Sequence, residues 1–325
     1  MRVGVLGPQY PDSFADNVAH CLPDLGVDVV RLGAARYSTR SLRVNHLNDL
    51  VSNSVTSYDA RQQARAVDAA VDSGCDVVIS VASGLLPTSV AKFRNAGIPI
   101  ALWFPDAVAN LGRQLMIAGD YSRVYFKDAS LVERLVRQTG LPVAYLPEAC
   151  NPTWHKPQAD APAIESLVLV GNMYPSRVRV LEHLVADDVP LELYGGGFPR
   201  WLRAPELRAR HTGRHVTRLD KSRIFRGARA VLNNLHPAES GVNCRLFEAA
   251  GSGAAVLCES RDALADLFTP DEVIAYESYD ELVVKARQLL EDPDLGRRFG
   301  DAATVRAHAE HTYQHRLARI LEDLS

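Results

Sequence analysis

A polar block in the C-terminal half of the chain has residue types and spacing that suit the binding of an anion. It runs from Glu239 to Cys258 and contains Asn243, Arg245 and Glu248. Strand-like apolar runs precede and follow it, so a helix is expected to begin near Asn243. Backbone N–H groups at the start of such a helix attract anions, and Glu248 could accept hydrogen bonds from paired ribose hydroxyls. The alternative is an ordinary helix with solvent-facing Arg245 and Glu248, because polar residues are common at helix starts.

Other nucleotide and hydrolase motifs do not occur in the chain. There is no Gly-x-x-x-x-Gly-Lys-Ser/Thr, no Gly-x-Ser-x-Gly and no His-Glu-x-x-His. The first predicted strand ends in Gly4-Val5-Leu6-Gly7-Pro8, and Pro8 lacks an N–H for a pyrophosphate. These observations disfavour a P-loop enzyme and an NAD or FAD enzyme.

The sequence offers no pattern typical of a metal site. The five cysteines are scattered and none forms Cys-x-x-Cys, so we expect reduced thiols. The one Asp-x-Asp, at Asp292-Pro293-Asp294, is interpreted as a break between helices. We therefore predict neither a metal nor a cofactor.

Strand-length apolar runs alternate with helical patterns along the whole chain. Strands are expected at residues 2–6, 27–32, 76–81, 98–104, 123–127, 142–146, 166–170, 191–194, 230–235, 254–258 and 273–276, and helices near 13–22, 59–73, 176–185, 244–250 and 279–290. This alternation is typical of α/β proteins with parallel sheets. The stretch 32–57 is polar and is expected to be a loop.

A proline-rich stretch divides the chain. Four prolines fall within residues 147–162, which indicates an extended linker. We predict an N-terminal α/β domain at 1–147, the linker at 148–162, and a C-terminal α/β domain at 163–305. Residues 306–325 are predicted to form an amphipathic helix that packs on its own domain or returns to the N-terminal one. The fold class is therefore two Rossmann-like, doubly wound parallel-sheet domains that face each other across a cleft, where ligands bind.

Composition excludes several classes of protein. The 325 residues carry a net charge of −3, with 47% hydrophobic and 23% charged residues. These values argue against disorder and against a nucleic-acid partner. No apolar run is long enough to cross a membrane or to serve as a signal peptide, so a cytoplasmic protein is expected. Peripheral contact with a membrane is left open.

Several phrases of the C-terminal half resemble GT-B glycosyltransferases, in particular the spore-maturation-protein (CgeB-like) group. The phrases are Leu146-Pro-Glu-Ala-Cys-Asn-Pro152, His155-Lys-Pro157, Val170-Gly-Asn172 with Tyr174-Pro-Ser-Arg177, Val231-Leu-Asn233, and the block from Asn243 to Gly253. In the N-terminal half the likeness is mainly in the pattern and in Trp103-Phe-Pro-Asp106. The resemblance implies a nucleoside-diphosphate sugar held by the C-terminal domain and an acceptor presented by the N-terminal domain.

The resemblance also implies roles for individual residues. Glu248 would bind the ribose, while Arg177, with Lys221 or Arg223, would face the diphosphate. Asn172, Asn243 and Arg245 lie within the matching phrases and are predicted to bind the donor. Positive charge of this kind stabilises a departing nucleoside diphosphate.

One carboxylate departs from the family pattern. Many retaining GT-B enzymes carry a second Glu eight positions before the ribose-binding one, and here that position is Ser240, with Glu239 one residue away. The contact to the sugar is assigned to Glu239, Asn243 or a backbone amide. If the enzyme inverts, Asp106, which follows a predicted strand, is the expected general base.

The predicted function is metal-independent transfer of a sugar from a nucleoside-diphosphate sugar to a small-molecule, glycan or protein acceptor. The alternatives are a sugar-nucleotide epimerase, a non-catalytic nucleotide-sugar binder on the same fold, or a two-lobed solute-binding module. The nucleotide base, the sugar and the acceptor are not specified by the sequence.

Overall fold

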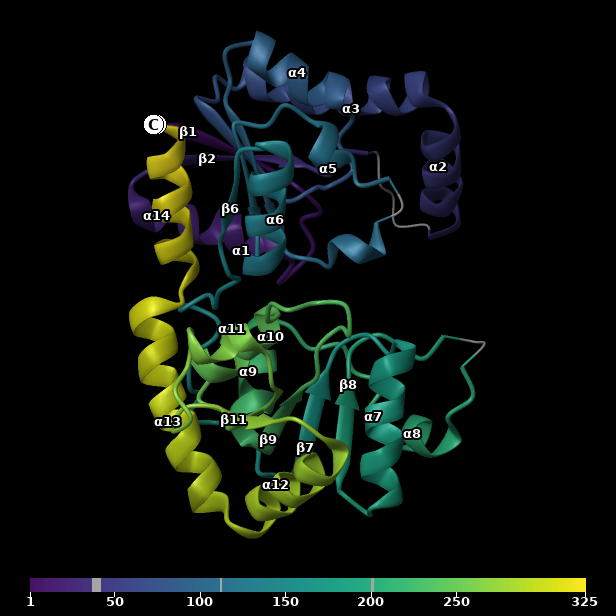
Figure 1. Cartoon of the computed structure of the whole chain (residues 1–325), viewed down its shortest axis with the longest axis vertical. Coiled ribbons are helices and arrows are strands. Elements are labelled where there is room, and N and C mark those ends of the chain that lie inside the picture. Colours follow the sequence, from purple (N-terminus) through teal and green to yellow (C-terminus); the bar gives the residue numbers. More distant parts are fainter. Residues whose placement is uncertain (37–41, 112, 200–201) are drawn as a thin grey trace. The chain divides into compact units, whose positions relative to one another are not determined.

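The computed structural model describes residues 1–36, 42–111, 113–199 and 202–325. These residues form two compact units. Unit 1 comprises Met1–Pro147 and Tyr313–Ser325, and unit 2 comprises Glu148–Thr312. Both are of α/β type (Figure 1).

Unit 1 is built on a six-stranded sheet with the strand order β2-β1-β3-β4-β5-β6, and every neighbouring pair is parallel. The strands are β1 (Arg2–Leu6), β2 (Asp28–Gly33), β3 (Val77–Ser80), β4 (Ile100–Phe104), β5 (Arg123–Phe126) and β6 (Val143–Tyr145). The helices are α1 (Phe14–Cys21), η1 (Leu22–Leu25), α2 (Leu42–Ser54), α3 (Thr56–Asp72), α4 (Pro87–Asn95), η2 (Val108–Asn110), α5 (Leu115–Ala118), α6 (Ala129–Thr139) and α14 (Tyr313–Leu324).

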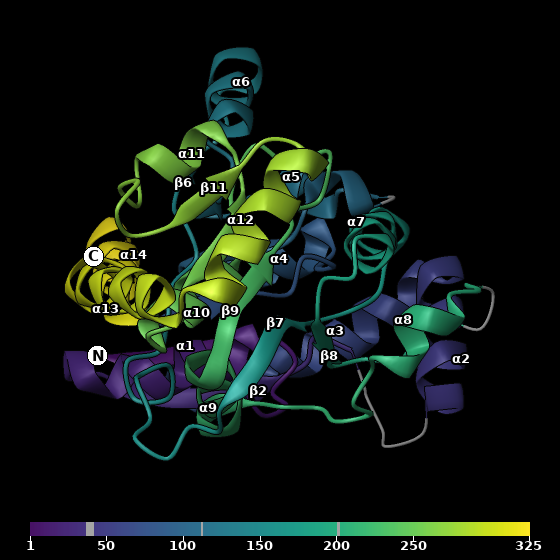
Figure 2. The ribbon, with the colours of Figure 1, turned by 90° about the horizontal axis from the view of Figure 1, so that it is seen from below.

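Unit 2 is built on a five-stranded parallel sheet with the order β11-β10-β9-β7-β8. The strands are β7 (Ile164–Val170), β8 (Leu191–Tyr194), β9 (Ala228–Asn233), β10 (Val256–Glu259) and β11 (Ile274–Tyr276). The helices are α7 (Pro175–Ala186), α8 (Pro205–Ala209), α9 (Arg218–Gly227), α10 (Cys244–Gly251), α11 (Asp262–Ala265), α12 (Tyr279–Glu291) and α13 (Pro293–Glu310). Figure 2 shows the strands of this sheet from below.

Alternate residues of the strands of unit 2 fill two separate cores. Val168 and Val231 belong to one core, whereas their neighbours Leu167 and Leu232 belong to the other. Because successive side chains of a strand point to opposite faces, a sheet buried on both sides reads as a continuous apolar run. Because of these continuous apolar runs, the strands could be predicted within a few residues of their observed bounds. The predicted class of two doubly wound parallel sheets is confirmed.

The stretch 32–57 is not the expected loop. Helix α2 occupies Leu42–Ser54, while residues 37–41 lie outside the described part of the chain. The side chains that α2 buries are polar, namely Asn48 and Ser52, which bond Gln62 of α3. A helix that packs through polar side chains has no apolar residues at helical spacing on its buried face, so hydrophobic periodicity could not predict it.

The proline-rich stretch is not an extended linker along its whole length. Glu148, Asn151 and His155 are buried within unit 2, and the chain turns there because the Asn151 N–H donates to His155 Nδ1 at 2.9 Å. Proline suits such turns as well as extended chain. The first residues of this stretch therefore belong to the interior of unit 2.

The end of the chain forms two helices where one was expected at 306–325. Helix α13 ends at Glu310, and α14 begins at Tyr313 as part of unit 1. The Tyr313 ring packs edge-on against Phe14 and Trp103, with centroids 5.5 and 5.6 Å apart, and α14 lies beside α1 (Figure 1). In the described part of the chain, no helix combines the length and apolar character that crossing a membrane requires.

Candidate functional site

The candidate site lies in unit 2, at the carboxyl ends of β7 and β9. These strands are neighbours in the sheet although β8 separates them in sequence. Such a reversal of strand order opens a crevice between the loops that follow the two strands, and ligands of α/β proteins bind there. The loop after β7 begins at Gly171, and the segment after β9 leads into α10.

Gly171 allows two arginines to approach the end of β7 closely. A Cβ atom at this position would lie 2.7 Å from Arg177 Nη1 and 3.0 Å from Arg245 Nη1. Its φ of +154° also disfavours other residues. Both guanidinium groups therefore lie against the same glycine, although they come from α7 and α10.

Arg177 is buried and organises the loops around it. It donates to Asn234 Oδ1 at 2.7 Å, to the Asn172 carbonyl at 2.8 Å and to the Tyr174 hydroxyl at 2.9 Å. Burial lowers the pKa of Arg177 to about 10; Arg245 contributes to this shift, while Tyr174 opposes it. Burial removes water from this guanidinium, so an anion beside it would stabilise its charge.

Arg245 has donor capacity that no described residue uses. Its Nε is buried and has no hydrogen-bond partner, and Glu248 Oε2 lies 3.8 Å from it. The planar guanidinium can hold a phosphate through two parallel hydrogen bonds. Arg245 is thus the residue of this site best able to accept an anionic ligand.

Glu248 and Lys221 form a buried ion pair beside the two arginines. Lys221 Nζ lies 2.8 Å from Glu248 Oε1, and both side chains are more than 90% buried. Lys221 is held there by α9, which was not predicted, and Glu248 by α10. The pair fixes the carboxylate that was predicted to bind a ribose.

Helix α10 begins where the sequence predicts. Asn243 is its N-cap and accepts the backbone N–H of Arg245 at 3.1 Å. Its first turn carries no acidic residue. The partial positive charge of the helix start therefore adds to the two guanidinium groups.

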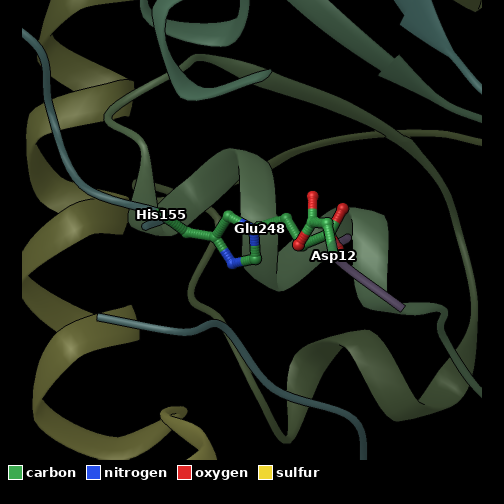
Figure 3. Close-up of side chains that lie close together, drawn as sticks. All are labelled: Asp12, His155 and Glu248. Atoms are coloured by element: carbon green, nitrogen blue, oxygen red, sulfur yellow. The ribbon is translucent and has the colours of Figure 1, made fainter. Parts of the chain in front are cut away.

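Two buried residues of the predicted linker also adjoin the site. His155 has a ring nitrogen within 4.8 Å of a Glu248 carboxylate oxygen, and Figure 3 shows both side chains. Glu148 is also buried. Burial of the Cys244 thiol raises the pKa of that thiol, and the negative charges of Glu248 and Glu148 raise it further. Sequence reasoning gave these residues no firm role; the signal was their presence in phrases that match the family.

Four other predicted residues occupy different surroundings. Arg223 bonds Asp160 and Asp220, so it is not brought to the site. Glu239 is half-buried in the loop after β9, and its carbonyl accepts from Arg261. Asn172 is exposed next to Gly171, and Asp106 is exposed in unit 1, two residues after β4.

The site therefore combines three cations with two carboxylates on the described residues. Arg177, Arg245 and Lys221 are the cations, and Glu248 and Glu148 are the carboxylates. The excess of positive charge, the helix start and the backbone turn at Gly171 suit an anionic ligand that also offers hydroxyl groups to Glu248.

A family model of glycosyl transferase-like proteins matches residues 177–322. No curated protein sequence matches the chain significantly. Among solved structures, a sucrose-phosphate synthase from Thermosynechococcus elongatus is 13% identical over 99% of this chain and 98% of its own, with a TM-score of 0.66.

Two further solved structures share the fold over nearly the whole chain. Anabaena Alr3699/HepE, in complex with UDP and glucose, is 12% identical over 99% of both chains with a TM-score of 0.67. A glycosyltransferase from Rickettsia africae is 11% identical over 99% of this chain and 97% of its own, with a TM-score of 0.64. Residues 177–322 thus match a glycosyl transferase-like family model, and the chain has the two-sheet α/β fold of these GT-B glycosyltransferase structures.

Proposed function

We propose that this protein transfers a glycosyl group from a nucleoside-diphosphate sugar bound by unit 2. The observation that carries the proposal is the pair of guanidinium groups, Arg177 and Arg245, against Gly171 at the strand-order reversal. Two adjacent cations suit a diphosphate, which carries several negatively charged oxygens close together. The carboxylate nearest to Arg245, that of Glu248, is 3.8 Å away.

The remaining residues would bind the rest of the donor. Glu248, oriented by Lys221, would accept hydrogen bonds from the ribose hydroxyls. The solved structures of HepE in complex with UDP and glucose or with UDP-glucose favour a uridine nucleotide. Glu239, Asn172 and the start of α10 are our candidates for contacts to the sugar.

We propose that the transfer needs no metal ion. Charge that develops on the departing diphosphate would be stabilised by Arg245, Arg177 and the N–H groups of α10, which act as fixed donors. Asp106 of unit 1 is our candidate for the general base that accepts the proton of the acceptor hydroxyl. The acceptor is a small molecule, a glycan or a protein, and the closer likeness to the spore-maturation group is part of this proposal.

Incubation with a panel of UDP-, GDP- and dTDP-sugars tests the donor. A matching nucleotide at 100 times its Kd should raise the free energy of unfolding by about 2.7 kcal/mol in a thermal-shift assay. If no nucleoside diphosphate or its sugar stabilises the protein, the proposal is wrong.

A second measurement separates transfer from other uses of the same site. Release of nucleoside diphosphate in the presence of an acceptor indicates transfer, whereas epimerised donor or binding without turnover indicates the alternative functions. Asp106→Asn should retain donor binding and lose most of the transfer rate, about 100-fold or more for a general base. Unchanged turnover would remove Asp106 from this role.

A further inference from the structure

Helix α2 of unit 1 packs with its polar face inward. Asn48 and Ser52 are buried, and their side chains bond Gln62 of α3, at 3.2 and 2.8 Å. The Tyr58 hydroxyl donates to Asn48 Oδ1 at 2.9 Å. A helix of a globular protein normally turns its apolar stripe to the core, so α2 is inverted.

The outward face of α2 is aliphatic. Leu47 is 62% exposed and Leu50 is 52% exposed, and three valines extend the same surface. The members of this aliphatic stripe are Val44, Leu47, Leu50 and Val51 of α2 and Val55 directly after it. At 100° per residue, the four α2 positions span about 120° of the helix, the width of an ordinary buried stripe. Apolar side chains gathered in this way mark an interaction surface.

Positive charge accompanies the aliphatic stripe. Arg43 of α2 and Arg61 and Arg65 of α3 are exposed, and none forms an ion pair with a residue that the structure describes. Two carboxylates of these helices, Asp49 and Asp59, lie against Arg36, at 3.9 and 2.6 Å. Within the described part of the chain, these three arginine charges therefore have no ion-pair partner.

An open hollow lies beside the contact between α3 and α2. It has a volume of about 520 Å³ and is lined by Tyr58, Arg61, Gln62 and Arg65. The two guanidinium groups at its wall suit a phosphate group. Figures 1 and 2 show α2 and α3, whose contact the hydrogen bonds above define.

We propose that α2 docks unit 1 on the surface of an anionic lipid membrane. The aliphatic stripe lies at the boundary of headgroups and acyl chains, and Arg43, Arg61 and Arg65 contact lipid phosphates. A helix with one apolar face and basic flanks binds membranes in this in-plane manner. The inference concerns a surface of unit 1 and does not depend on the proposed donor site.

The size of the stripe favours a membrane over a second copy of the chain. Five half-exposed aliphatic side chains offer roughly 150–300 Å² of apolar surface, at about 60–120 Å² for a fully exposed one. A stable protein interface buries about 800 Å² on each partner. Arginines that form no ion pair with a described residue would also repel their counterparts in a symmetric dimer, whereas anionic headgroups attract them.

Co-sedimentation with vesicles tests the proposal. The full chain is mixed with vesicles of phosphatidylcholine alone and with vesicles that contain 30% phosphatidylglycerol. We expect binding to the anionic vesicles that weakens with salt, because lipid charge is screened within a Debye length. Failure to bind anionic vesicles, or equal binding to both kinds, would overturn the proposal.

Two variants assign the binding to this surface. Leu47→Ser with Leu50→Ser should lower the partition coefficient at least tenfold, and so should Arg61→Gln with Arg65→Gln. The matched control, Val284→Ser with Val305→Ser, changes two exposed valines of unit 2, which are 54% and 72% exposed. All three should melt as the wild type does, because the altered side chains are exposed.

Two results would contradict the assignment. If the Leu47/Leu50 variant binds vesicles as tightly as the control does, α2 is not the docking helix. If the wild type is a dimer in size-exclusion chromatography and that variant is a monomer, the stripe is a self-association surface and the membrane proposal is wrong.

Discussion

At the scale of single residues, the candidate site depends on two arginines with different roles. Arg177 donates to two loops and holds them together, whereas Arg245 keeps a buried Nε that makes no hydrogen bond to any described residue. We therefore expect Arg245 to contribute more directly to ligand binding, and Arg177 to contribute both charge and loop order. The sequence pointed to both arginines but could not separate their duties, because these depend on Asn234 and Gly171.

Arg245→Gln should weaken binding of nucleoside diphosphate by about 10- to 100-fold, the loss of one or two charge-assisted hydrogen bonds. Isothermal titration with UDP measures this. The matched control is Arg223→Gln, since Arg223 bonds Asp160 and Asp220. It should bind like the wild type; equal losses in both variants would mean that general charge, and not the geometry at Gly171, determines affinity.

Glu248 and Lys221 should depend on each other for stability. Glu248→Gln leaves a buried ammonium without its carboxylate, which typically costs about 3–5 kcal/mol. Adding Lys221→Met should restore much of this stability, while nucleotide binding stays weak in both variants. Urea denaturation measures the first quantity and titration with UDP the second. A single variant as stable as the wild type would contradict the coupling.

At the scale of elements, the starts of the helices that follow the strands place the residues of the site. The sequence indicated α10 correctly, because Asn243 is a strong cap and an apolar strand follows. It did not indicate α9, which supplies Lys221, or α2, which packs through polar side chains. Strands buried on both faces carry a strong pattern, whereas short or inverted helices carry a weak one.

Asn243→Ala tests the contribution of the α10 start. Loss of the cap should cost about 1 kcal/mol of stability and also weaken nucleotide binding, because the cap fixes the backbone of Arg245. Ser278→Ala removes the cap of α12, which accepts the Glu281 N–H at 3.2 Å. It should cost a similar amount of stability in a melting experiment without affecting binding. If both variants bind UDP equally weakly, the loss reflects stability alone.

At the scale of the whole molecule, the two units do not correspond to two consecutive segments of the sequence. Unit 2 is one continuous segment, whereas unit 1 takes its last helix from the end of the chain. The amphipathic pattern of residues 313–324 showed that this helix must pack on something. The two aromatic partners in unit 1, Phe14 and Trp103, lie more than 200 residues earlier, so no local pattern could identify them.

Tyr313→Ala should destabilise unit 1 and leave unit 2 intact. Removal of a buried aromatic ring costs about 3–5 kcal/mol. Hydrogen exchange followed by mass spectrometry should show faster exchange in peptides from β1 to β6, with protection in β7 to β11 unchanged. Uniformly faster exchange in both sheets would show that the two units unfold together.

Because α14 belongs to unit 1, the two units are completed in a defined order during synthesis on the ribosome. Domains usually fold as their segments emerge, from the N-terminus onward. Here the N-terminal unit is completed after unit 2, because Tyr313 and its helix are synthesised after every segment of unit 2. Until then the surface around Phe14 and Trp103 lacks its cover. A nascent chain stalled just before Tyr313 would thus present the complete segment of unit 2 together with an incomplete unit 1.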